Sequence, residues 1–584
     1  MRRAAGTGAL LGLLLAGPAP ADEAARLAAL GQEVWAFRLE SDPLFATGVG
    51  DHSRDDRLPD LSPAALARRA AFARDALARL RALDRSALPP GERLNAAVLE
   101  RQLQDELTAR EFGLERIPIL ADDGFHLALA QLPRQMRFDT PADYERYLAR
   151  LRAVPAYFDQ NVAHLRAGLR DGFTQSRAVL EGYEQGISAH VVADPETSVF
   201  YEPFRSFPPG VPEAGREGLR AAGRAAIREA VVPAYARFLD FFVRQYRPGA
   251  RTSTGCSDLP RGRELYARLV KGFTTLDLAP EEVHATGLRE VARIEAEMQA
   301  AMRKAGFQGA LPAFLELLRT EPRFYARTPE ELLMRAAAHA KRVDGALPAL
   351  FGRLPRAPYG VEPVPDSLAP KYTGGRYVEA SPGSTRAALF WVNTYALDTR
   401  PLYVLEALTL HEAVPGHHLQ IALQQELEGL PPYRRVADVT AFVEGWALYA
   451  ERLGLEAGFY RDPYSDFGRL TYEMWRACRL VVDTGLHSQG WTRQQARDYL
   501  AAHTALSLHE VATETDRYVS WPGQALAYKT GELKIRELRA RAERELGPRF
   551  DLRAFHDAVL ENGPVPLDVL EQRIDAWIAE RRRS

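Results

Sequence analysis

Signals for helix starts recur along almost the whole chain, and they constrain its fold more than any other feature. Ser62-Pro63, Thr140-Pro141 and Thr328-Pro329 each place a capping side chain before a proline that suits the first helical turn. Thr328 to Glu331 and Thr492 to Gln495 also have the spacing of a capping box. This pattern predicts a chain built mainly of helices.

Apolar residues behind these starts follow helical spacing, whereas alternation with a period of two is scarce. Long segments rich in Ala, Leu, Arg and Glu lie near residues 64–84, 215–246, 281–303, 492–505 and 523–545. The best strand candidate is residues 387–392 (AALFWV), which follow a loop rich in Pro and Gly between about 355 and 385. We therefore expect a mainly α-helical protein with a small β element.

Charge and length exclude some classes and leave the domain count open. The 584 residues carry 75 Lys plus Arg against 77 Asp plus Glu, a formal charge of -2, so we expect no nucleic-acid partner. Hydrophobic content of 46% and charged content of 26% exclude wholesale disorder. The Pro/Gly-rich stretch 247–263 either separates two lobes, 22–250 and 251–584, or is a surface loop within one domain.

The N-terminus has the pattern of a secretory signal. Arg2-Arg3 precede an apolar stretch from 4 to 16, and the small-residue run Ala19-Pro20-Ala21 follows. We expect a signal peptide over 1–21, a mature domain over 22–584 and export, to a bacterial periplasm. No other stretch approaches the ~20 apolar residues of a membrane span, so we expect no stable membrane anchor.

The chain contains two distant cysteines, Cys256 and Cys478. Two thiols are too few for a disulfide framework or a cysteine-based zinc site. They form either a single bridge or two separate buried thiols, since a free cysteine packs as a small hydrophobe.

The strongest chemical signal is the segment 411–418 (HEAVPGHH), which closes a nearly all-apolar helix predicted over 401–410. The familiar zinc-hydrolase pattern places histidines at i and i+4 with a glutamate base at i+1. Here the i+4 position is Pro415, so the standard motif is absent.

The proline itself suggests how a metal site forms in this segment. On an unbroken helix His411 and His417 would lie about 9 Å apart along the axis, too far to share an ion. Pro415 breaks the helix, and Gly416 tolerates unusual angles, so His417 can return to the position of the second ligand. His418 would then contact the substrate or support a ligand. The alternative is a satisfied polar cluster in the core.

A catalytic zinc site also needs a third protein ligand. The segment 441–451 (AFVEGWALYAE) offers Glu444 and Glu451. Glu444 is preferred, because it lies in an apolar run where an unpaired carboxylate would be costly to bury. Glu451 is followed by Arg452, so we interpret it as a solvated or paired charge.

Three segments together resemble one bacterial family. Residues 411–420 (HEAVPGHHLQ), 444–451 (EGWALYAE) and 522–535 (PGQALAYKTGELKI) are similar to the signatures of domain-of-unknown-function family 885, which is grouped by similarity with the gluzincin zinc metallopeptidases. The resemblance covers most of the mature chain. It implies a large two-lobed helical metallopeptidase fold, with the β element beside the active-site helix. The sequence departs from the gluzincin pattern by a two-residue insertion between its histidines.

The resemblance also implies a mechanism and its residues. One Zn2+ would be held by His411, His417 and Glu444, and Glu412 would take a proton from the water that attacks a peptide carbonyl. Tyr518 and Tyr528 are both candidate donors to the developing oxyanion, and Tyr528 is the first choice. The alternative for Tyr528 is a buried, hydrogen-bonded core tyrosine.

Several further residues are candidate contacts of the substrate. Tyr518 and His418 are two of them. Arg517 and Lys529 could each grip a peptide carboxylate; the alternative for each is a solvated charge or a structural ion pair. His487 would orient substrate or pack as a satisfied core histidine. The predicted strand at 389–392 could pair with an extended substrate along its edge.

Three functions fit this constellation. The first is an exported zinc peptidase, of dipeptidase or carboxypeptidase type, acting on peptides. The second is a metal-dependent hydrolase of non-peptide amides or esters. The third, a non-catalytic peptide-binding protein, is disfavoured because the expected base and all three ligands are present.

Overall fold

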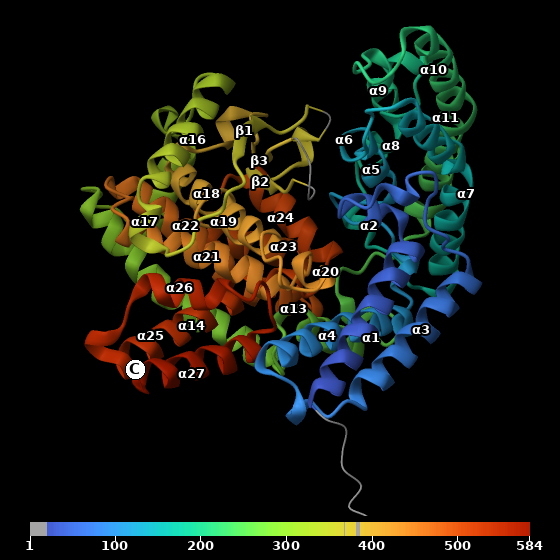
Figure 1. The fold of residues 1–584 in the computed structure, drawn as a ribbon. Coiled ribbons are helices and arrows are strands. Elements are labelled where there is room, and N and C mark those ends of the chain that lie inside the picture. Colours follow the sequence, from blue (N-terminus) through green and yellow to red (C-terminus); the bar gives the residue numbers. More distant parts are fainter. Residues whose placement is uncertain (1–19, 367, 381–385, 584) are drawn as a thin grey trace, which may run out of the picture.

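Helices make up most of the structure, a computed structural model that describes residues 20–366, 368–380 and 386–583 (Figure 1). The predicted signal peptide lies almost wholly outside the described residues. The first half contains α1 (Pro20–Ser41), α2 (Pro43–Gly48), α3 (Pro63–Arg81), α4 (Pro90–Phe112), α5 (Phe125–Leu129), α6 (Leu132–Gln135), α7 (Pro141–Asp171), α8 (Glu184–Ser188), α9 (Glu202–Arg205), α10 (Glu213–Ala226), α11 (Val232–Phe241) and α12 (Arg247–Gly249).

The second half of the chain contains the remaining helices. These are α13 (Gly262–Thr274), α14 (Pro280–Lys304), α15 (Leu311–Thr320), α16 (Pro329–Asp344), α17 (Leu347–Leu350), α18 (Leu405–Glu412), α19 (His417–Gln425), α20 (Pro432–Arg435), α21 (Thr440–Glu456), α22 (Pro463–His487), α23 (Arg493–His503), α24 (Leu508–Ser520), α25 (Ala527–Leu546), α26 (Leu552–Leu560) and α27 (Leu567–Arg583). The mainly helical fold predicted from the sequence is confirmed.

The predicted caps begin their helices. Ser62 accepts a hydrogen bond from the Ala65 N–H at the start of α3, and Thr328 accepts one from the Glu331 N–H at the start of α16. At α7, the Thr140 N–H donates to Asp143 at 2.8 Å. These side chains satisfy backbone groups that the first helical turn leaves unpaired.

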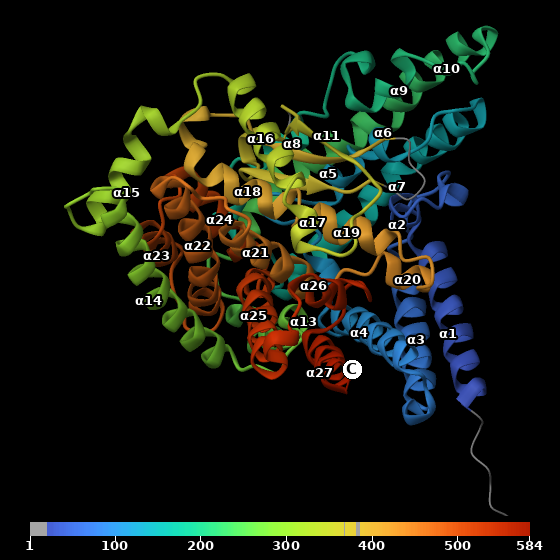
Figure 2. The ribbon, with the colours of Figure 1, turned by 60° about the vertical axis from the view of Figure 1, so that its left-hand side comes forward.

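The two halves of the chain share one hydrophobic core. In Figures 1 and 2, α1 to α11 form one side of the molecule, while α14 packs along α22 in the other. The largest cluster of buried apolar side chains nevertheless takes members from both sides of the 247–263 connection, including Tyr144 and Leu151 of α7 and Met474 of α22.

Three strands form a small sheet within the described residues. They are β1 (Tyr359–Pro363), β2 (Gly375–Val378) and β3 (Ala388–Val392), in the order β1-β3-β2, with β1 parallel and β2 antiparallel to β3. The predicted strand is β3, and β2 lies beside α18. The expectation that this strand offers an edge to substrate is wrong, because β3 is central and paired on both sides.

The cysteines are separate. Cys256 and Cys478 are both free and buried, so the two-thiol alternative holds and the bridge does not form. Burial raises the pKa of the Cys256 thiol to about 12.

Two glycines bring α21 and α25 into direct backbone contact. A methyl group on Gly531 would lie 1.8 Å from the Ala441 carbonyl oxygen and 2.7 Å from the Gly445 Cα. No side chain fits at this distance, so the crossing requires glycine. The contact fixes the spacing between Glu444 and Tyr528, which lie within one and three residues of these glycines.

Replacing Gly531 by Ala should therefore force the two helices apart. We expect a loss of about 1–3 kcal/mol in the free energy of unfolding, as in other overpacked cores. Gly218 of α10 is the matched control, since nothing lies within 4 Å of its added methyl group, and Gly218→Ala should leave stability unchanged or raise it by roughly 0.5–1 kcal/mol. Urea denaturation of both variants checks this; equal stabilities would contradict a tight crossing.

Candidate metal centre

The site forms where the helix bearing the first histidine stops. Helix α18 ends at Glu412 and α19 begins at His417, with Val414, Pro415 and Gly416 in the connection. The Trp446 indole N–H of α21 donates to the Pro415 carbonyl at 2.8 Å and holds the connection in place. A methyl group on Gly416 would lie only 1.9 Å from the His411 carbonyl oxygen.

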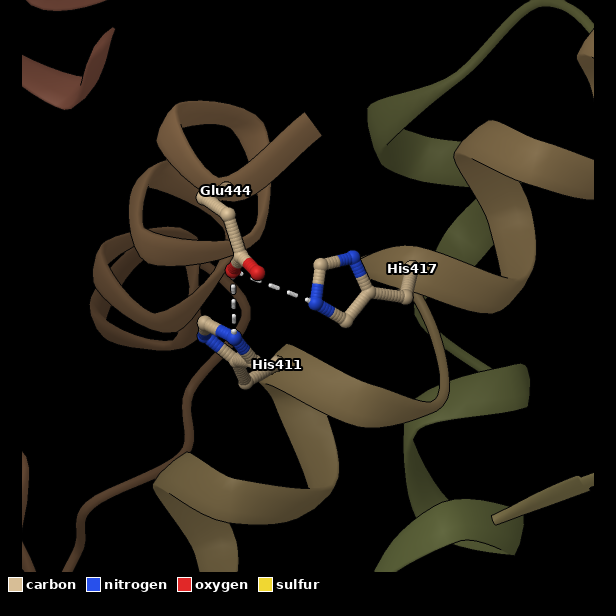
Figure 3. A group of neighbouring side chains, drawn as sticks. All are labelled: His411, His417 and Glu444. Carbon is tan, nitrogen blue, oxygen red and sulfur yellow. Dashed lines mark ion pairs between the residues drawn. The ribbon is translucent and has the colours of Figure 1, made fainter. Parts of the chain in front are cut away.

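This connection brings His411 and His417 together, with ring centroids 4.7 Å apart. Figure 3 shows both rings beside the Glu444 carboxylate, which comes from α21. The Nε2 atoms of His411 and His417 each lie 3.4 Å from Glu444 Oε2. One ligand atom from each residue can be chosen so that all three lie within 4.8 Å of one another.

The donor set fits a divalent cation. Glu444 Oε2 is buried and has no hydrogen-bond partner among the described residues, although it faces two histidine nitrogens. An unsatisfied buried carboxylate oxygen is costly, and a metal ion would satisfy it. Two imidazole nitrogens and one carboxylate oxygen are the protein ligands of many catalytic zinc sites.

The second nitrogen of His411 is also occupied. His411 Nδ1 lies 2.8 Å from Glu451 Oε1, and Arg476 lies 3.4 Å from the same oxygen. Glu451 is buried, so it is a paired charge rather than a solvated one. A carboxylate on the outer nitrogen fixes the ring and leaves Nε2 directed at Glu444, as in many metal sites.

The charges of the cluster shift the pKa values of His411 and Glu444. Burial alone would lower the pKa of His411, but the carboxylates of Glu444 and Glu451 beside its two ring nitrogens raise the pKa to about 9. Burial would raise the pKa of Glu444, yet the charges of His417 and His411 beside it lower the pKa well below its usual range. The cluster therefore favours an ionised carboxylate with positive charge beside it.

Glu412 points toward the sheet. Its carboxylate accepts a hydrogen bond of 2.7 Å from the backbone N–H of Tyr377 in β2. This N–H is on the side of β2 that does not pair with β3. No other described strand pairs with that side, so this edge of the sheet runs past Glu412. The exposed Arg376 precedes Tyr377. Sequence reasoning missed both residues, because they lie in the segment expected to be a loop.

Tyr528 lies beside the histidines. Its ring is nearly parallel to that of His411, with centroids 6.5 Å apart. Its hydroxyl oxygen lies 3.1 Å from Arg517 Nη2 and 3.4 Å from Gln524 Nε2. The structure thus places Tyr528 next to the cluster and joins Arg517 to it through the phenol.

His418 and Tyr518 are buried and turned to other partners. The imidazole of His418 meets the Ala357 carbonyl at 3.0 Å and the Tyr377 hydroxyl at 3.3 Å. The Tyr518 oxygen accepts from the Trp475 indole and from Arg479. Neither residue joins the group formed by His411, His417 and Glu444.

Lys529 and His487 are packed as structural residues. Lys529 is fully buried and pairs with Glu290, Glu473 and Glu532 at 2.9–3.1 Å. His487 lies between the Cys256 N–H and the Tyr518 carbonyl, which fix its tautomer. Lys529 is therefore part of a structural ion-pair cluster, and His487 is a core histidine with both ring nitrogens bonded.

The architecture and the cluster together define a mainly helical protein with two histidines and one glutamate gathered at a helix break. The chain belongs to the family of bacterial proteins of unknown function DUF885, whose model matches residues 43–574. No curated protein matches the chain.

Two solved structures are similar over nearly the whole chain. A protein from Colwellia psychrerythraea, described as a "putative lipoprotein", is 28% identical, with a TM-score of 0.88 over 96% of this chain and 99% of that one. A "putative lipoprotein of unknown function" from Shewanella oneidensis is 18% identical and shares the fold, with a TM-score of 0.71 over 95% and 99%. Among the described residues of this chain, no helix is both long and apolar enough to cross a membrane.

A buried carboxylate anchors the third motif. Asp483 of α22 accepts a hydrogen bond of 2.6 Å from the Tyr266 hydroxyl and bonds at 3.1 Å from the Gly523 N–H. Burial raises the pKa of Asp483 to about 7, although both hydrogen bonds oppose the shift. The turn before Gln524 and Tyr528 therefore depends on a carboxyl group that titrates near neutrality.

This titration predicts a pH-dependent stability. A carboxyl pKa raised by folding stabilises the protein fully below its unfolded value, about 3.9, and this contribution is lost as pH rises through about 7. The free energy of unfolding, relative to Asp483→Asn, should fall by about 2–4 kcal/mol between pH 4 and pH 8. Denaturant melts of both proteins measure the difference; a difference that does not change with pH would contradict the assignment.

Proposed function

We propose that this protein is a zinc-dependent peptidase in which His411, His417 and Glu444 hold one Zn2+. The observation that supports it most is the buried Glu444 oxygen, which faces the Nε2 atoms of both histidines at 3.4 Å and has no hydrogen-bond partner in the described part of the chain. A cation supplies the missing interaction, and Glu412 follows the first ligand directly in the chain.

In the proposed reaction, the metal and two nearby side chains have separate roles. Bound zinc would polarise the scissile carbonyl and make water easier to deprotonate. Glu412 takes the proton of the attacking water and passes it to the nitrogen of the leaving amine. The Tyr528 hydroxyl donates a hydrogen bond to the carbonyl oxygen as negative charge develops on it.

The sheet favours peptides over other amides and esters. The unpaired edge of β2 runs past Glu412, and extended peptides bind such edges through backbone hydrogen bonds. Arg376 lies on the same strand and adds positive charge that suits a peptide carboxylate. The expected signal at 1–21, with the likeness to proteins described as lipoproteins, supports a location in the bacterial cell envelope.

Metal analysis tests the ligands. His411→Ala, His417→Ala and Glu444→Ala should each reduce bound zinc from about one ion per chain to near zero, because the site then lacks one of three protein ligands. His418→Ala is the matched control, since its ring bonds to Ala357 and Tyr377 instead. Inductively coupled plasma mass spectrometry gives the metal content. Loss of zinc only in His418→Ala would overturn the ligand assignment.

Substitution of the base separates binding from chemistry. Glu412→Gln should keep its zinc and lose roughly 10²–10⁴-fold in kcat, because the amide cannot accept the proton of water. The assay is digestion of a peptide library by the zinc-loaded protein, with chelated protein as control. Full turnover in Glu412→Gln would exclude its role as base. Cleavage of a panel of esters and non-peptide amides, with no cleavage of peptides, would favour the alternative hydrolase.

A further inference from the structure

The hydrogen bonds of Tyr528 determine where its proton points. An arginine side chain can only donate, so the Gln524 atom that lies 2.9 Å from Arg517 Nη2 must be its carbonyl oxygen. The amide nitrogen of Gln524 then faces the Tyr528 oxygen at 3.4 Å and donates to it. Arg517 donates to the same oxygen at 3.1 Å.

With Arg517 and Gln524 both donating to it, the Tyr528 hydroxyl can make one further hydrogen bond, in which it is the donor. A tyrosine hydroxyl has two acceptor lone pairs and one proton. Because Arg517 and Gln524 occupy the lone pairs, the proton of Tyr528 must point away from both of them. The ring has limited freedom to turn, since the Arg479 guanidinium lies 4.1 Å from its centroid and the His411 ring lies nearly parallel to it.

Arg517 is held in turn by a buried carboxylate. Glu514, one turn earlier on α24, is fully buried and lies 2.8 Å from Arg479 and 3.8 Å from Arg517. The Tyr518 oxygen accepts from Trp475 and Arg479, which are both donors only, so its own proton is left for another acceptor. Burial would raise the pKa of Glu514, but the charges of Arg479 and Arg517 lower it below its usual value.

We infer that Arg517 is a positioning residue: with Gln524 it fills the acceptor sites of the Tyr528 hydroxyl and directs the phenolic proton toward the space beside His411. This inference rests on the proposed function for its catalytic meaning. It gives Arg517 a role through Tyr528 in place of a grip on the substrate.

A readout that needs no turnover tests the contact. With 3-fluorotyrosine placed at position 528 of the full chain, the ¹⁹F resonance reports the surroundings of the phenol. Arg517→Gln should shift this resonance, and Arg517→Lys, which keeps a charge near Glu514, should shift it too. Arg493→Gln is the matched control. Arg493 pairs with Asp516, the residue before Arg517 on α24, so this substitution should leave the resonance unchanged. An unchanged resonance in both Arg517 variants would overturn the inference.

Kinetics then distinguish positioning from substrate binding. In the zinc-loaded protein, Arg517→Gln should lower kcat about 10–10²-fold with little change in KM, a smaller loss than removing an oxyanion donor outright. In a Tyr528→Phe background, Arg517→Gln should lower kcat little further, because the two residues act as one unit. A raised KM that persists in Tyr528→Phe and disappears with C-terminally amidated peptides would overturn the inference. Absence of any peptide cleavage by the wild type would instead contradict the peptidase proposal, and the ¹⁹F result would stand separately.

Discussion

The break between Glu412 and His417 is the constraint on which the whole site depends. On a continuous helix the two histidines would lie too far apart to share an ion. Pro415 prevents such a helix, so α18 ends and α19 begins in a new direction. The connection can position His417 only if its own backbone is fixed in place. The indole of Trp446 bonds the Pro415 carbonyl, so α21 clamps the break while it also supplies Glu444.

Close helix packing sets the remaining distances. Gly445 and Gly531 allow the backbones of α21 and α25 to touch, which places the helix of Glu444 against the helix of Tyr528. Buried charges nearby are matched to partners: Glu451 holds His411, and Lys529 lies among three carboxylates. Ionised groups that are buried in this way are stable only when paired, so the surroundings of the cluster have little freedom to rearrange.

Local chemistry explains how much could be predicted from the sequence. Helix starts at Ser62 and Thr328 were readable because a cap and its proline act within one turn. Strand β3 was readable from its apolar run, but β1 and β2 are short pieces of a Pro/Gly-rich segment whose pairing lies outside their own sequence. The contact of Tyr377 with Glu412, and the edge it creates, were therefore not predictable.

By itself, the sequence determined the helical class and the set of groups able to bind a metal, because helix caps and a proline in a histidine motif act over a few residues. Only the tertiary structure decided which partner each group has. His418 and Tyr518 are neighbours of the motif residues in sequence, yet they bond elsewhere, while Arg517 reaches Tyr528 eleven positions away. The physical reason is that a buried polar group takes the nearest group able to satisfy it, and packing between distant helices determines which group is nearest.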